Sequence, residues 1–163
     1  MKKMNKKGFT LIELLAIIVI LAIIAVITVP IILDIIDNAR KGAEKNSVIG
    51  YGKAVELAYT QAQYDTAMGT ANGAHSVENT DTTKVANGQQ IAMTVGTSTV
   101  NLVVDFDGDK VVCAGTSDTN KIVDGKVYLT GCKVNGATTP EYKYGNGKAC
   151  TGSDTSCDAP AQP

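Results

Sequence analysis

The first third of the chain contains an apolar segment that limits what the chain can fold into. From Phe9 to Leu33 there are 25 residues, and Glu13 is the only one among them with an ionisable side chain. At a rise of ~1.5 Å per residue this segment is ~37 Å long as an α-helix, whereas the hydrocarbon core of a bilayer is ~30 Å thick. The sequence therefore predicts a membrane-spanning helix over residues 9–33, with one carboxylate near its start.

Residues 1–8 form a short basic leader before this segment. The leader holds four of the chain's 15 basic residues and no acidic one, which leaves 11 basic against 16 acidic side chains in the rest of the chain. By the positive-inside rule the N-terminus stays in the cytoplasm and the C-terminal part is exported. The acidic balance of that exported part makes nucleic acid an unlikely direct ligand, because nucleic-acid surfaces are basic.

The N-terminus differs from an ordinary secretory signal peptide. A signal peptide has an apolar core of ~7–15 residues that is followed by a small-residue cleavage site. Here the apolar segment is longer, and no such site closes it. The favoured processing point is the bond between Gly8 and Phe9, which precedes the segment. The sequence thus predicts that the leader is removed and that the apolar helix remains in the mature protein.

Pro30 lies near the end of the apolar segment. Proline has no backbone N–H and its ring clashes with the preceding turn, so a kink or weak point is expected there. In lipid, neighbouring groups or the Thr28 hydroxyl would have to satisfy the carbonyl that Pro30 leaves free.

The helical pattern continues past Leu33 and becomes amphipathic over residues 34–64. One apolar stripe, at helical spacing, consists of Val48, Tyr51, Val55, Tyr59 and Ala62, and an adjoining stripe consists of Gly50, Ala54, Leu57 and Ala58. We therefore expect a single helix from about Thr10 to Tyr64. Its second half is suited to lie against a sheet.

The rest of the chain predicts a surface loop, a β-rich head and a tail. Residues 65–88 are polar and without periodicity, and the only histidine, His75, is interpreted as a solvated loop residue. Residues 89–157 contain short β-prone runs that predict an antiparallel meander of about four strands, at residues 91–95, 100–106, 110–113 and 126–130, with a final piece at 132–134 and 142–144. Residues 158–163 are expected to be disordered. The predicted fold class is α+β, with a long helix packed on a small antiparallel head.

All four cysteines, Cys113, Cys132, Cys150 and Cys157, lie in the exported part, where disulfides persist. Zinc is disfavoured because no pair has CxxC spacing and no histidine lies near them. Four cysteines permit three connectivities. The strand pattern favours a bond between neighbouring strands, Cys113–Cys132, and one that closes a short loop, Cys150–Cys157. Such staples suit this domain, which has no Trp and, since Phe9 lies in the apolar segment, only Phe106 and the tyrosines as large rings to fill its core.

The sequence offers no catalytic set and no cofactor motif. It has no evident Ser/His/Asp set, paired cleft carboxylates or phosphate-binding loop, so we expect no enzyme activity and no cofactor or metal. The segment 105–109 invites a calcium loop, but an EF-hand counted from Asp105 would place glycine and glutamate where Lys110 and Thr116 stand. A hairpin turn at Asp107-Gly108 explains the segment.

The residues Lys7-Gly8-Phe9-Thr10-Leu11-Ile12-Glu13, with the apolar run and Pro30, resemble the type IV pilin and pseudopilin family over roughly residues 1–60. The resemblance implies that a prepilin peptidase cuts between Gly8 and Phe9 and N-methylates Phe9. It further implies that the subunit waits in membrane lipid until the pilus or secretion assembly machinery extracts it into a helical homopolymer. In such filaments the N-terminal helices form the core, and the segment around Pro30 often loses helical structure.

Two interpretations of Glu13 remain open. The resemblance implies that its carboxylate pairs with the N-terminal amine of Phe9 on a neighbouring subunit. Alternatively, Thr10-x-x-Glu13 is a capping box, in which Glu13 accepts a hydrogen bond from the backbone amide of Thr10. The second interpretation needs no partner.

The sequence therefore favours a structural subunit of a type IV pilus or a closely related extracellular filament, first anchored in the cytoplasmic membrane by one span. A pseudopilin of a secretion or DNA-uptake apparatus is the first alternative. A signal-anchored surface binding protein that never polymerises is the second.

Overall fold

The computed structural model describes residues 8–70, 73–77, 81–115, 119–136 and 140–161. The chain divides into two compact units, Met1–Lys41 and Gly42–Pro163. The first seven residues of the predicted leader and the last two of the predicted tail lie outside the described residues.

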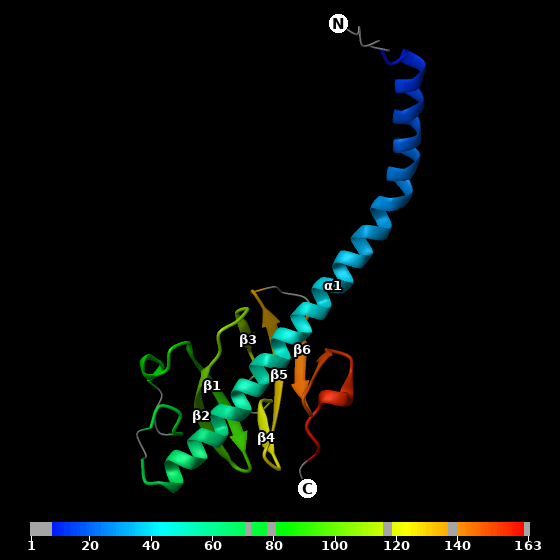
Figure 1. Cartoon of the computed structure of the whole chain (residues 1–163). Helices are drawn as coiled ribbons and strands as arrows, with labels where there is room; N and C mark the ends of the chain where they lie inside the picture. The colour runs from blue at the N-terminus through cyan, green and yellow to red at the C-terminus, as the bar shows by residue number, and fades with distance from the viewer. Residues whose placement is uncertain (1–7, 71–72, 78–80, 116–118, 137–139, 162–163) are drawn as a thin grey trace, which may run out of the picture. The chain divides into compact units, whose positions relative to one another are not determined.

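Helix α1 runs from Leu11 to Ala67, close to the predicted helix (Figure 1). In the first unit every described residue is exposed. This helix is the one described element that is long and apolar enough to cross a membrane, and its apolar window is not buried by the chain itself.

Helix α1 continues without interruption through Pro30. The Thr28 hydroxyl donates to the carbonyl of Ile24 at 2.7 Å. The carbonyl that Pro30 leaves free is that of Val26, four residues before it, so Thr28 does not supply the missing hydrogen bond. In a helix, a threonine hydroxyl donates to the carbonyl four residues before it, which for Thr28 is that of Ile24. Only a hydroxyl at position 30 would reach Val26 in this way.

In the second unit, α1 packs on the sheet through a buried stripe of small and medium side chains. The stripe consists of Val48, Tyr51, Val55, Ala58 and Ala62, and it joins the core cluster of the head. The predicted stripe is thus largely confirmed, with Tyr59 half-buried at its margin. On the adjoining apolar stripe Ala58 is buried and Ala54 is half-buried, but Leu57 is 58% exposed.

The head contains seven strands among the described residues. They are β1 (Gly88–Val95), β2 (Ser98–Asp105), β3 (Val111–Cys113), β4 (Lys121–Val123), β5 (Lys126–Val134), β6 (Tyr142–Gly145) and β7 (Lys148–Thr151). The order in the sheet is β2-β1-β4-β5-β6-β7, with β3 also paired to β5. Figure 1 shows α1 crossing one face of this sheet.

The α+β class is confirmed, but the expected antiparallel meander of about four strands is wrong. The sheet is mixed, since β1 and β4 are parallel. β4 has only three residues, too few for a period-two pattern. β7 is an addition to the predicted sheet, because no strand was expected after residues 142–144. Asn146 and Gly147 both have positive φ, which makes them a tight hairpin turn between β6 and β7.

The predicted loop 65–88 holds the end of α1 and a 3₁₀ turn, η1 (Thr82–Lys84), that Asp81 caps. The interpretation of His75 as a solvated side chain is wrong. His75 is half-buried, and its Nδ1 lies 2.7 Å from the carbonyl oxygen of Val103 in β2. A single loop histidine carries no sequence pattern from which this contact follows.

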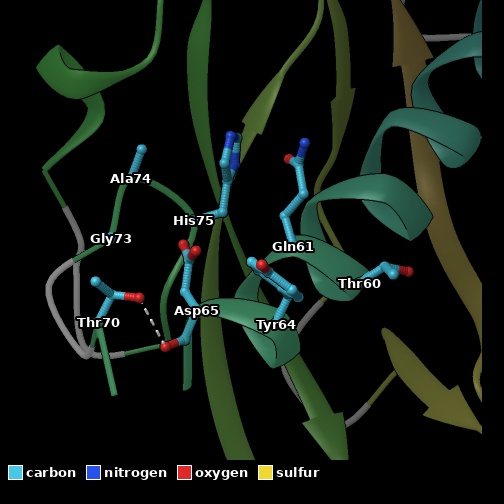
Figure 2. Close-up of a pocket in the computed structure, with 8 residues that line it drawn as sticks. All are labelled: Thr60, Gln61, Tyr64, Asp65, Thr70, Gly73, Ala74 and His75. Atoms are coloured by element: carbon cyan, nitrogen blue, oxygen red, sulfur yellow. Dashed lines mark hydrogen bonds between the residues drawn. The ribbon is translucent and has the colours of Figure 1, made fainter. Parts of the chain in front are cut away.

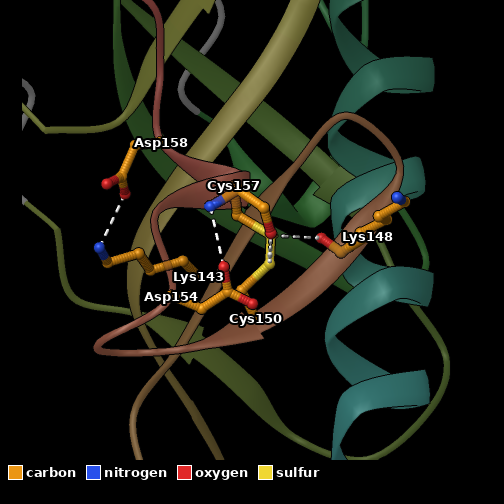
Figure 3. Close-up of a disulfide and its surroundings, with 7 residues drawn as sticks. Lys143, Lys148, Cys150, Asp154, Cys157 and Asp158 are labelled. Carbon is orange, nitrogen blue, oxygen red and sulfur yellow. Dashed lines mark hydrogen bonds and ion pairs between the residues drawn. A yellow bond between two sulfur atoms is a disulfide. The ribbon is translucent and has the colours of Figure 1, made fainter.

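Two disulfides staple the head, with the two pairings that the strand pattern favoured. Cys113 and Cys132 are directly opposite each other on β3 and β5. Cys150 in β7 joins Cys157 in the 3₁₀ turn η2 (Thr155–Cys157), as Figure 3 shows. At the start of the expected disordered tail, Asp158 forms an ion pair with Lys143 at 2.7 Å.

Candidate processing and assembly site

The predicted processing point lies just before the first turn of α1. Gly8, Phe9 and Thr10 precede the helix, and the Phe9 side chain is 80% exposed. A Cβ atom added to Gly8 would meet nothing within 4 Å. The Gly8–Phe9 bond is therefore accessible, and no contact among the described residues requires glycine at position 8.

Thr10 and Glu13 form a closed capping box at the start of α1. The Thr10 backbone N–H and hydroxyl both donate to Glu13 Oε2, at 2.9 Å and 2.8 Å. The Glu13 backbone N–H donates to Thr10 Oγ1 at 3.3 Å. Helix starts leave backbone donors without partners, and this arrangement satisfies two of them. The capping interpretation thus holds within one chain.

The Glu13 carboxylate remains exposed although it caps the helix. Only one of its two oxygens takes part in the capping box, so a second, charged partner can still approach the other oxygen. The pairing of Glu13 with Phe9 of another copy stays a prediction.

The helix surface around this site is apolar on all sides. Large side chains such as Leu11 and Val26 are more than three-quarters exposed. Each such side chain contributes ~1.5–3 kcal/mol when it is removed from water. A helix of this kind requires lipid or other apolar helices around it.

Two tyrosines of β6 join the second half of α1 to the sheet. These contacts were not predicted from the sequence. The Tyr142 hydroxyl donates to Glu44 Oε2 at 2.7 Å, and the Tyr144 hydroxyl donates to Glu56 Oε1 at 3.0 Å. Burial, and then the Glu56 carboxylate, raise the pKa of Tyr144. Two tyrosines at alternating positions of a strand, on one face of the sheet, were the available signal.

Tyr144 also explains a glycine in the middle of α1. A Cβ atom on Gly52 would lie 2.5 Å from three ring atoms of Tyr144, which is fully buried. Glycine at position 52 therefore permits the close approach of helix and sheet. Nearby on α1, burial raises the pKa of Tyr51 to about 12.

The acidic segment at residues 105–109 takes part in the packing of the head. Asp109 accepts hydrogen bonds from Ser47 at 2.8 Å and from Asn135 at 3.3 Å. The Asp105 carboxylate accepts from the backbone N–H of Asn87 at 3.3 Å. Across the described ranges, no group of three or more His, Cys, Asp or Glu side chains is placed to hold a metal ion.

A comparison with protein families found one match. The family described as the prokaryotic N-terminal methylation motif matches residues 3–29, which include Gly8, Phe9 and Glu13. The chain carries the signature of type IV pilins and pseudopilins. Its pilin-like arrangement, one long helix with an exposed apolar first half and a sheet packed on the second half, agrees with this signature. No curated protein and no solved structure gave a significant match.

The pilin-like signature has three consequences. It implies processing by a prepilin peptidase and assembly by a pilus-like machinery. Together with the exposed apolar helix it fits a membrane-anchored precursor. It also points to a structural protein rather than an enzyme.

Proposed function

We propose that this chain is a structural subunit of a type IV pilus or a closely related extracellular filament. Its leader is removed between Gly8 and Phe9, Phe9 is N-methylated, and the processed chains polymerise through α1. The observation that carries the proposal is the methylation motif at residues 3–29, which extends into the first part of α1, where every described residue up to Lys41 is exposed.

The exposed apolar surface suits a helix that is first surrounded by lipid and later by the helices of other copies. Before assembly, lipid covers the apolar side chains of residues 9–33, and residues 34–64 connect the span to the exported head. During assembly, the same side chains move from lipid into contact with the helices of other copies. Because both environments are apolar, the transfer changes the hydrophobic free energy little, so specific contacts must select the filament.

Glu13 supplies such a contact. A carboxylate in the apolar part of a membrane costs ~2.5–3.5 kcal/mol on insertion scales, and less near a helix end. The capping box gives the carboxylate two donors but leaves its charge uncompensated. Pairing with the positively charged amine of Phe9 on another copy removes this cost and fixes the register of neighbouring subunits.

The first experiment is mass spectrometry of the mature N-terminus, with a Gly8→Val variant as control. We expect the wild-type chain to begin at N-methylated Phe9 and the variant to keep its leader. Position 8 has free space around it, so a loss of processing in the variant reports on the peptidase rather than on the fold. A wild-type chain that begins at Met1 would contradict the proposal.

The second experiment is imaging of sheared surface fractions, with labelling of this chain. We expect filaments in which the chain is the main component. A processed, methylated chain that stays in the membrane fraction and forms no filament would contradict the pilus proposal and favour a pseudopilin or an anchored surface protein.

A further inference from the structure

A groove lies in the head beside the last turns of α1. It has a volume of about 600 Å³, within the ~300–1,000 Å³ typical of ligand clefts. Its main lining side chains are Gln61, Tyr64 and Asp65 from α1, with Thr70, Gly73 and His75 from the segment that follows. Figure 2 shows Gln61 and His75 extending in the same direction, with Tyr64 and Asp65 at their base. The assembly site described above does not use any of these residues.

The helix brings three of these side chains to one face because they are separated by three and four residues. Tyr64 is 64% exposed, so its ring presents a broad apolar face to the groove. In the part of the chain that the structure describes, the half-buried Asp65 carboxylate has no hydrogen-bond or ion-pair partner. Both oxygens of an ionised carboxylate are acceptors, so Asp65 can accept hydrogen bonds from a ligand in the groove.

The contact between His75 and Val103 holds the segment that follows α1 in place. The Nδ1 atom of His75 must carry its proton toward the Val103 carbonyl, since a carbonyl only accepts. In the neutral ring, Nε2 is then a hydrogen-bond acceptor. At Gly73, a Cβ atom would overlap the Asp65 carboxylate, so glycine leaves the room that this carboxylate occupies.

The chemistry of the lining selects among ligand classes. Among the described residues that line the groove there is no lysine or arginine, and the Asp65 carboxylate repels anions, which disfavours phosphates and acidic groups as ligands. Asp65 and His75 alone are too few to hold a metal ion. A neutral sugar fits better, because its hydroxyls donate to Asp65 and His75 and bond Gln61 in either direction. Its C–H face packs against the Tyr64 ring.

We propose that this groove binds a neutral saccharide. Tyr64 provides the stacking surface, and Asp65, Gln61 and His75 provide the hydrogen bonds that fix the orientation of the sugar. The site belongs to the head alone, so the proposal does not depend on processing or polymerisation.

The test uses the full chain, solubilised in detergent and applied to a glycan array that covers neutral hexoses, deoxyhexoses and N-acetylhexosamines together with sialylated and sulfated glycans. We expect retention on neutral glycans and no preference for acidic ones. The affinity for the best neutral sugar is then measured by calorimetry for the variants Tyr64→Ala and Asp65→Asn. Leu57→Ala is the matched control, since Leu57 is a similarly exposed residue of α1 outside the groove.

We expect Tyr64→Ala to weaken binding about tenfold, as loss of an aromatic contact does, and Asp65→Asn to weaken it about tenfold or more. Leu57→Ala should leave the affinity unchanged. Retention of no neutral glycan, a preference for acidic glycans, or equal binding by all three variants would each overturn the proposal.

Discussion

Replacement of Glu13 by glutamine separates the two roles of this residue. Glutamine retains an oxygen that can accept from the Thr10 backbone N–H and hydroxyl, the two donors now 2.9 Å and 2.8 Å from Glu13 Oε2. Loss of a helix cap costs ~0.5–2 kcal/mol, and a neutral acceptor keeps part of this contribution. Helix α1 has 57 residues, so the membrane-inserted monomer should persist.

The effect on assembly should be much larger. With glutamine at position 13, the amine of Phe9 on the neighbouring copy is left without its counter-charge in an apolar filament core. An uncompensated charge in such surroundings costs ~2.5–3.5 kcal/mol, which corresponds to about a hundredfold in the association constant of each subunit. We therefore expect Glu13→Gln to abolish filaments while the processed subunit accumulates in the membrane.

The matched control is Thr10→Val, which removes the hydroxyl from the capping box but retains the Glu13 carboxylate. The assay is the ratio of subunit in the sheared fraction to subunit in the membrane, measured by immunoblot. We expect Thr10→Val filaments near the wild-type level. Normal filaments from Glu13→Gln would refute the pairing argument, and equal losses in both variants would assign the effect to capping.

Three further predictions concern the head. Gly52→Ala should lower the Tm, because the added Cβ meets the buried Tyr144 ring at 2.5 Å and overpacking costs ~1–3 kcal/mol. Gly42→Ala is the control: position 42 has open space, so alanine there should raise the stability by ~0.5–1 kcal/mol. Thermal melts of both variants check this. The pKa of Tyr51 is raised to about 12 in the folded head from ~10 in the unfolded chain, so its contribution to stability is complete below pH ~10 and is lost as the pH rises toward 12. Urea titrations across this range should show the loss, and Tyr51→Phe should reduce it. Thiol labelling of the exported chain should find no free cysteine, and removal of the disulfide that spans 19 residues should cost ~3 kcal/mol; four reactive thiols would contradict the staples.

The sequence predicted the elements that depend on local pattern. The helix followed from a continuous apolar run over residues 9–33 and from helical spacing of apolar residues over 34–64. The pairing of Cys113 with Cys132 followed because both cysteines lie in short β-prone runs that were expected to be neighbours. The capping box was also readable, since Thr10 and Glu13 stand at its required spacing.

Contacts between distant segments could not be predicted in the same way. The parallel pairing of β1 with β4 joins residues 94–95 to 121–122, and a three-residue strand carries too little pattern to reveal its partner. Leu57 was predicted on the apolar face but is exposed. The spacing of apolar residues does not show how wide the contact with the sheet is, because this width depends on side chains of the sheet such as Tyr144. The groove beside α1 likewise depends on where His75 is held, which β2 determines.

The positions of the two disulfides decide how a filament of such subunits would respond to tension. Both covalent staples join parts of the head to each other, and neither includes a residue of α1. Before a pulling force on α1 reaches the backbone that continues from Ala67 into the head, it acts on the non-covalent contacts between α1 and the sheet. These contacts are the buried stripe, the Ser47–Asp109 hydrogen bond and the bonds from Tyr142 and Tyr144 to Glu44 and Glu56. Those carboxylates are twelve residues apart, about 18 Å along the helix, so the load is spread over more than three turns. The mechanical limit of the subunit is thus set by non-covalent packing, and reduction of the disulfides would soften the head without releasing its attachment to the helix.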